Sequence, residues 1–177
     1  MGFKELLQNR RLLSILSRPK PVFAPSDTLF RKVGFIVCLN SVEQLKLVDK
    51  LCRLFSEQGD SCSVCIYQRN KKLPVPHSWG DNDWLVLDYK HVNWYGLIRP
   101  EAADSFVKQS FDLLINLSPE YYFTTSYMAA LTKARLKVGR YVRPQTPYHL
   151  VLGIEQAVDG DDFVRLLEDS LKCVKLP

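Results

Sequence analysis

The stretch FDLLINLSPEYYFTTSYMAALTKARLKVGRY, residues 111–141, predicts more of the fold than any other part of this chain. Residues 113–117, LLINL, are apolar at almost every position, which is typical of a strand covered on both faces in a parallel sheet. Residues 136–139, LKVG, resume a strand pattern after a helical segment. A strand, a helix and a second strand within about thirty residues form a βαβ unit. We therefore expect two parallel strands joined by a right-handed crossover.

The helix of this unit is expected to begin directly after the first strand. Ser118 offers an N-cap oxygen, Pro119 suits the first helical position, and Glu120 complements the helix dipole. The buried face of the helix is then predicted from residues that recur at helical spacing, namely Phe123, Tyr127, Ala130, Leu131 and Ala134.

Apolar strands and amphipathic helices alternate along the rest of the chain. Further strands are expected at residues 33–39, 63–67, 84–88 and 148–154, and further helices at residues 3–17, between Ser41 and Gly59, at residues 100–109, and from residue 159 onward with Phe163, Leu166, Leu167 and Leu171 on its apolar face. This alternation predicts an α/β fold, a three-layer sandwich with a mainly parallel sheet. The connection between the second and third strands has little helical pattern, so an antiparallel pair and an irregular crossover both stay open there.

The predicted fold is Rossmann-like only in a loose sense. The turn after the first strand reads LNSV, residues 39–42, and contains no G-x-G-x-x-G and no P-loop. The close backbone approach that a pyrophosphate needs is therefore not provided at this turn, and no cofactor is predicted.

The N-terminal segment differs in charge from the rest of the chain. Seven basic and two acidic residues fall within the first 32 positions, whereas the remaining positions carry equal numbers of the two kinds. Pro19, Pro21 and Pro25 favour an extended linker after the first helix. We expect two parts: a basic helix-and-linker arm at residues 1–31 and a single α/β domain at residues 32–177. The helix is expected to dock on its own domain or, in a homo-oligomer, on a neighbouring subunit. A membrane surface or a nucleic acid is the alternative.

Composition and cysteine content argue against a membrane-spanning protein and against a disulfide-bonded secreted protein. No stretch approaches the roughly 20 apolar residues of a membrane span, and Arg10 and Arg11 interrupt any signal-peptide core. An odd number of cysteines, five, indicates a reducing cytoplasm instead of a disulfide framework. Cys62 and Cys65 match C-x-x-C, but the alternation of a strand sends them to opposite faces. No metal site is therefore predicted.

A candidate ligand site follows from the expected sheet. In open parallel sheets, ligands bind beyond the carboxyl ends of the strands, where the strand order switches. The polar side chains at these predicted ends are Asn40, Ser41, Arg69, Asp88, Lys90, His91, Ser118 and Arg143. The helices that begin near Ser41 and Ser118 would direct backbone N–H groups at this rim, which favours an anion. Aromatic residues also cluster around the central loops, namely Trp79, Trp84, Trp94 and Tyr95. We expect them either to stack on a base or sugar of a ligand or to cover the edge of the core.

The chain resembles an uncharacterised family of short cytoplasmic proteins from Bacteroidetes, a domain of unknown function. Residues 32–36, 111–117 and 134–139 carry this resemblance, and the family implies no activity. Residues 111–139 are also similar to the N-terminal domain of heptosyltransferase-type glycosyltransferases, which open on an apolar D-L-L-I-x-L strand. The matching positions are Asp112, Leu113, Leu114, Ile115, Leu117, Ala134 and Gly139. The chain has no room for the donor-binding domain of such enzymes.

Three functions stay open at this point. The first is a cytoplasmic domain that binds a protein or a small ligand without catalysis. The second is binding or turnover of a phosphorylated metabolite or nucleotide at the strand ends. The third is contact of the basic arm with nucleic acid or with a membrane surface. Whether the protein is an enzyme is not predicted.

Overall fold

The computed structural model describes residues 2–17, 30–73, 75, 83–140, 146–153 and 160–173. The strands are β1 (Lys32–Leu39), β2 (Ser61–Gln68), β3 (Asp83–Leu87), β4 (Ser110–Asn116), β5 (Lys133–Gly139) and β6 (Leu150–Val151). The helices are α1 (Phe3–Leu16), α2 (Val42–Glu57), the short 3-10 helix η1 (Tyr89–His91), α3 (Pro100–Val107), α4 (Phe123–Leu131) and α5 (Gly160–Cys173). None of the described helices has the length and apolar character needed to cross a membrane.

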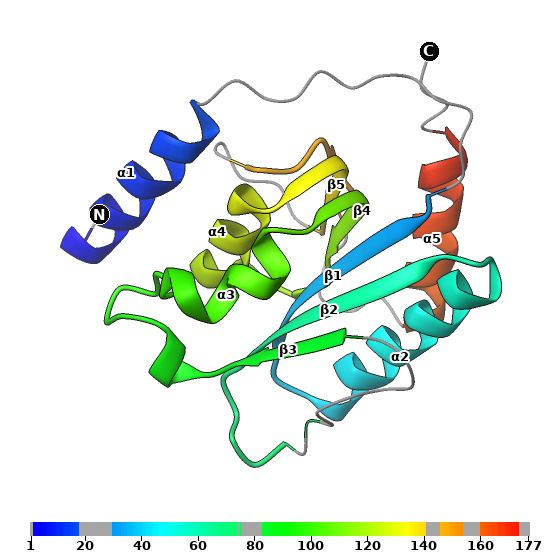
Figure 1. Cartoon of the computed structure of the whole chain (residues 1–177), viewed down its shortest axis with the longest axis horizontal. Coiled ribbons are helices and arrows are strands. Elements are labelled where there is room, and N and C mark those ends of the chain that lie inside the picture. The colour runs from blue at the N-terminus through cyan, green and yellow to red at the C-terminus, as the bar shows by residue number, and fades with distance from the viewer. Residues whose placement is uncertain are drawn as a thin grey trace.

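All six described strands form one parallel sheet in the order β3-β2-β1-β4-β5-β6 (Figure 1). The predicted α/β fold with a parallel sheet is confirmed. The antiparallel alternative for the second and third strands is wrong, because β2 and β3 pair in parallel. The order reverses between β1 and β4, where the chain turns from one half of the sheet to the other. This reversal is the switch point at which α/β sheets bind ligands.

Helices cover both faces of the sheet and give it three layers (Figure 1). One apolar cluster joins α2 and α5 to one face and includes Phe35, Leu51 and Phe163. A second cluster joins α3 and α4 to the other face and includes Phe106 and Met128. Strand alternation explains this division, and Cys62 and Cys65 of β2 accordingly belong to opposite clusters, as predicted.

Four details of the sequence prediction are corrected. Helix α4 begins at Phe123, so residues 118–122 form a loop and Ser118 is not its cap. Ala134, predicted on the buried face of that helix, lies in β5, whose residues are extended from Lys133 onward. Leu166 of α5 is 40% exposed, and Val164 is buried in its place, because the face of α5 that meets the sheet is rotated from the predicted stripe. The strand predicted at residues 148–154 is reduced to β6, and residue 154 lies outside the described residues.

Tyr148 joins the sheet to α4 in the interior. Its hydroxyl accepts a hydrogen bond from the side-chain amide of Asn116 at 2.5 Å and lies 3.5 Å from the hydroxyl of Ser126. Burial raises the pKa of this phenol from its ordinary 10.0 to about 12. The side chain is therefore a neutral structural group at physiological pH.

The raised pKa of Tyr148 predicts a loss of stability at alkaline pH. Between pH 10 and 12 the folded protein keeps a proton on Tyr148 that the unfolded chain has lost. The free energy of unfolding should therefore fall as the pH rises through this window, and the contribution is fully present below pH 10. Urea unfolding at several pH values would measure the slope. The substitution Tyr148→Phe should make the slope shallower, and an unchanged slope would contradict the assignment to this residue.

Candidate functional site

The strands β1 and β4 separate at their carboxyl ends, where the sheet reverses its order. Their last paired residues are Ile36 and Asn116, and the N–H of Leu117 still donates to the carbonyl of Ile36 at 2.7 Å. Beyond this point the N–H of Cys38 has no strand partner on this side. It donates instead to the hydroxyl of Ser118 at 2.9 Å. At the switch point, the Ser118 side chain therefore replaces the hydrogen bond that a neighbouring strand would otherwise make to this N–H.

Ser118 is fully buried and serves this connection. Its hydroxyl donates to Thr125 Oγ1 at 3.2 Å, and the Thr125 hydroxyl donates to the carbonyl of Tyr122, also at 3.2 Å. A chain of hydrogen bonds thus runs from β1 through Ser118 to the loop that precedes α4. The loop is held in place by groups that do not reach the surface.

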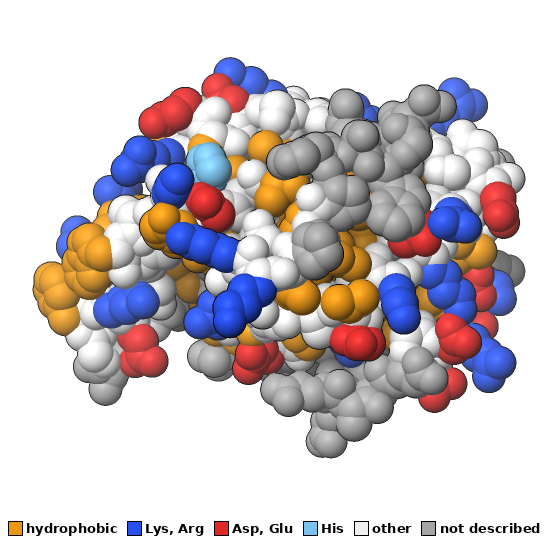
Figure 2. Space-filling model, turned by 90° about the horizontal axis from the view of Figure 1, so that it is seen from below, with side chains coloured by type: hydrophobic (Ala, Val, Ile, Leu, Met, Phe, Trp, Pro, Cys, Tyr) orange, Lys and Arg blue, Asp and Glu red, His pale blue; other side chains and the backbone are white. Residues whose placement is uncertain are grey.

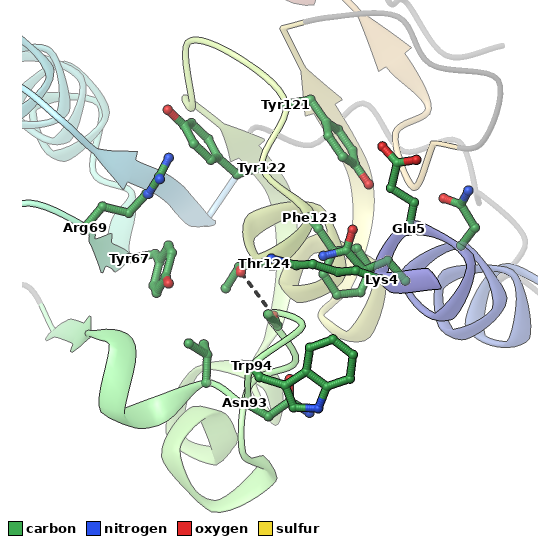
Figure 3. A pocket seen from close by; sticks show the side chains of 14 residues that line it. Lys4, Glu5, Tyr67, Arg69, Asn93, Trp94, Tyr121, Tyr122, Phe123 and Thr124 are labelled. Atoms are coloured by element: carbon green, nitrogen blue, oxygen red, sulfur yellow. Dashed lines mark hydrogen bonds between the residues drawn. The ribbon is translucent and has the colours of Figure 1, made fainter. Parts of the chain in front are cut away.

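A pocket of about 590 Å³ opens at this edge of the sheet, next to the ordered loop (Figure 3). This volume falls in the range of about 300–1,000 Å³ that is usual for small-molecule sites. Its lining combines aromatic, charged and amide side chains: Lys4, Glu5, Gln8, Asn9, Tyr67, Arg69, Val92, Asn93, Trp94, Gly96, Tyr121, Tyr122, Phe123 and Thr124. The lining comes from α1, the end of β2, the loop before α3, and the start of α4.

The polar wall of the pocket is built around Tyr122. The guanidinium of Arg69 lies over the Tyr122 ring, 5.2 Å from its centroid. The Tyr122 hydroxyl accepts from the side-chain amide of Asn40 and donates to the carboxylate of Glu120. A cation stacked on a tyrosine is ordered without being neutralised, because the ring offers only a weak electrostatic attraction. Arg69 therefore keeps its charge available to an anion.

Burial controls the protonation of the nearby phenols and thiol. It raises the pKa of Tyr67 and of Tyr122, and hydrogen bonding to Glu120 adds to the effect at Tyr122. Burial likewise raises the pKa of the Cys38 thiol to about 12, although Arg69 opposes the shift. These three groups are protonated at physiological pH, so they offer hydrogen bonds and apolar contact, not a nucleophilic anion.

The start of α4 borders the pocket. Tyr122 precedes the helix and makes no side-chain cap, and the first N–H groups of any helix lack intrahelical acceptors. Phe123 and Thr124, which carry two of these groups, line the pocket. The Thr124 hydroxyl donates to the carbonyl of Gly96 at 3.0 Å and fixes the facing loop (Figure 3). Gly96 has a φ of +89°, a conformation that favours glycine.

Helix α1 forms the opposite wall, although it lies far in the sequence from the other lining residues. The Gln8 side chain donates from Nε2 to the carbonyl of Tyr95 at 2.6 Å. Leu12 is 1% exposed, and α1 contacts α4. The helix therefore docks on its own chain. Its residues Lys4, Glu5, Gln8 and Asn9 line the pocket, and Lys4 extends from the helix across the opening (Figure 3).

Comparison with known proteins places this chain in a family. The model of a Family of unknown function (DUF6913) matches residues 4–173. The chain belongs to this family. No curated protein and no solved structure matches it. The predicted membership of an uncharacterised domain family is confirmed, whereas a Bacteroidetes origin and a similarity to heptosyltransferase-type enzymes stay predictions. The match to DUF6913 begins within α1, so the family model includes the helix that walls the pocket.

The structure of this DUF6913 chain brings two of the predicted site residues to the pocket. Arg69 lines it, and Asn40 reaches it through its hydrogen bond to Tyr122. Ser41 precedes α2, and the side chain of Gln44 accepts from the backbone N–H groups of Asn40 and Ser41 at 2.6 and 3.3 Å. Ser118 is buried below the pocket, as described above.

The remaining predicted residues do not line the pocket. Asp88 caps the 3-10 helix η1 and accepts from the N–H of Lys90 at 2.8 Å, while its own N–H donates to His91 Nδ1 at 3.0 Å. These residues thus stabilise a local turn, with the Lys90 side chain exposed. Arg143 lies outside the described residues. No group of three or more His, Cys, Asp and Glu side chains arranged to hold a metal occurs in the described ranges.

Most of the residues that line the pocket were not predicted from the sequence. Trp94 was noted as a stacking candidate, but Tyr67, Tyr121 and Tyr122 were not, since aromatic residues at strand and helix ends are common in any core. Their signal was the position of each next to a predicted strand end. The residues of α1 gave no signal, because nothing in the local pattern shows that the helix returns to the rim of the sheet.

Proposed function

We propose that this protein is a binding domain for a small phosphorylated ligand that carries a planar ring, such as a nucleotide or a sugar phosphate. The observation that carries the proposal is the pocket at the switch point. There Arg69, Lys4 and the first residues of α4 share one lining with Tyr122 and Trp94. Cations and helix N-terminal amides favour a phosphate, and aromatic faces favour a base or sugar.

Binding is favoured over turnover by the state of the polar groups. The phenols of Tyr67 and Tyr122 have raised pKa values and stay protonated, so they can donate to an anion but do not attack it. The Cys38 thiol is held neutral for the same reason. A cytoplasmic location belongs to this proposal, and it is supported by Cys38, Cys52, Cys62 and Cys65, which are free thiols.

The test is a thermal-shift screen with nucleoside mono-, di- and triphosphates, sugar phosphates and inorganic phosphate, followed by calorimetric titration of any ligand that stabilises the protein. A ligand that binds only the folded state raises the unfolding temperature, and well above its Kd the stabilisation grows with the logarithm of its free concentration. We expect a stabilising ligand to contain both a phosphate and a ring, and inorganic phosphate to act more weakly. The absence of any shift at millimolar concentrations would contradict the proposal.

The substitution Arg69→Gln should weaken the identified ligand by roughly tenfold to a hundredfold, because a charge-assisted hydrogen bond is lost. Arg165→Gln is the matched control, since Arg165 is exposed on α5 and does not line the pocket. The two variants should unfold at nearly the same temperature in the absence of ligand. Equal affinities for both variants would place the anion elsewhere.

A further inference from the structure

The side of α1 that faces away from the pocket is apolar and exposed. Phe3 is 70% exposed, Leu6 is 54% exposed and Leu13 is 45% exposed. With 3.6 residues per turn these three lie on one side of the helix, opposite Leu12, which is buried against the chain. The helix therefore docks through Leu12 and the half-buried side chains around it, and it leaves Phe3, Leu6 and Leu13 uncovered.

The same side of α1 carries positive charge. Arg10 falls between Leu6 and Leu13 on the exposed face, and Arg11 is exposed at its margin. Glu5 is the one acidic residue of α1, and it lines the pocket. Figure 2 shows orange and blue side chains gathered at the left end of the molecule, where α1 lies.

We propose that this outward face of α1 docks on the surface of an anionic lipid bilayer. A helix with phenylalanine and leucine on one side and arginines beside them lies in the interface of a membrane, its apolar side chains at the acyl boundary and its cations at the headgroups.

Charge and shape favour the bilayer over other occupants. A second copy of the chain would bring Arg10 and Arg11 against the same residues of its partner, and like charges at close range oppose association. A protein partner usually recognises anchors seated in pockets. Here the leucines and the phenylalanine stand on a convex helix, which a fluid acyl boundary accommodates and a rigid surface does not.

The experiment is co-sedimentation of the intact protein with vesicles of phosphatidylcholine and with vesicles of equal parts phosphatidylcholine and phosphatidylserine. We expect the protein to pellet with the second kind and to remain in solution with the first. Added salt should release it, because the arginines act through screened charge. The double variant Arg10→Gln/Arg11→Gln should lower the partition coefficient on the anionic vesicles by roughly thirtyfold.

The apolar contribution is tested separately with Leu6→Asn/Leu13→Asn, which should lower the partition coefficient by roughly tenfold or more. Leu166→Asn is its matched control, since Leu166 is an exposed leucine on α5, and it should leave the partition unchanged. All the substituted positions are exposed, and circular dichroism should give the same helix content for each variant.

Three results would overturn the proposal. One is that the unaltered protein pellets with neither kind of vesicle or with both equally. Another is that Leu6→Asn/Leu13→Asn pellets as the unaltered protein does. The third is a concentration-dependent dimer, seen by light scattering without vesicles and abolished by the same double variant, because a second copy would then cover the face. The ligand screen above is done without lipid, so its outcome is independent of these results.

Discussion

The substitution Gly139→Ala is expected to lower the free energy of unfolding by about 3 kcal/mol. A methyl carbon added to Gly139 would lie 2.3 Å from Cδ2 of Tyr148 and 2.6 Å from two further ring atoms. The ring cannot move aside easily, since its hydroxyl is bonded to Asn116 next to Ser126. For a chain of this length, the unfolding temperature should fall by roughly 10 °C.

Chemical denaturation of a double-mutant cycle measures this effect and assigns it to the ring. In the background of Tyr148→Ala the space beside Gly139 is empty, so Gly139→Ala should then cost little, which gives a large coupling energy. Gly160→Ala is the control, because its added carbon would meet only Leu47 at an ordinary 3.8 Å. A fully additive cycle would show that the steric contact with Tyr148 is not the cause.

The substitution Ser118→Ala is expected to lower the free energy of unfolding by about 2 kcal/mol. Ser118 is 0% exposed, and its hydroxyl both accepts from the N–H of Cys38 and donates to Thr125. Without that hydroxyl, a backbone donor at the end of β1 is left buried and unpaired. The loop that bears Tyr122 should also lose order, since its carbonyl accepts from Thr125.

Urea unfolding together with hydrogen exchange resolved by residue would test this expectation. The Cys38 amide should exchange faster in the variant than the loss of global stability alone explains. Ser14→Ala is the control, because Ser14 is exposed on α1 and bonds only the preceding turn. Unchanged stability and unchanged exchange at Cys38 would show that another group satisfies this amide.

Hydrophobic runs predicted the layers of the fold well, for a physical reason. Segments such as residues 33–39 and 113–117 have no polar face that could be exposed to water. They must therefore lie in the interior of a sheet that helices cover on both sides. The order of the strands was not predictable in this way. It depends on which strands pair across long distances in the chain, and the connection from β2 to β3 carries no helical pattern that would indicate a crossover.

The incorrect prediction that Ser118 caps a helix shows that tertiary contacts can override local helix-capping preferences. A serine followed by proline and glutamate is a good start for a helix, yet the structure uses that serine to complete the hydrogen bonding of β1. The helix then begins at Phe123, five residues later. The rule that ligands bind beyond the carboxyl ends of parallel strands correctly pointed to Arg69 as a residue of the pocket. The α1 side of the pocket was not predictable in this way, because the spacing of residues in α1 does not show where the helix docks.

Helix α1 takes no part in the hydrogen bonding of the sheet, and yet it supplies Glu5, Gln8 and Asn9 to the lining of the pocket. Global unfolding reports mainly on the strands and the two apolar clusters beside them. Substitutions at Glu5 and Asn9 should therefore change the unfolding temperature little while altering the affinity for the proposed ligand, whereas a substitution at Gln8 also removes the hydrogen bond to Tyr95. A mutational survey that records only protein abundance or unfolding temperature would therefore classify Glu5 and Asn9 of α1 as tolerant of substitution.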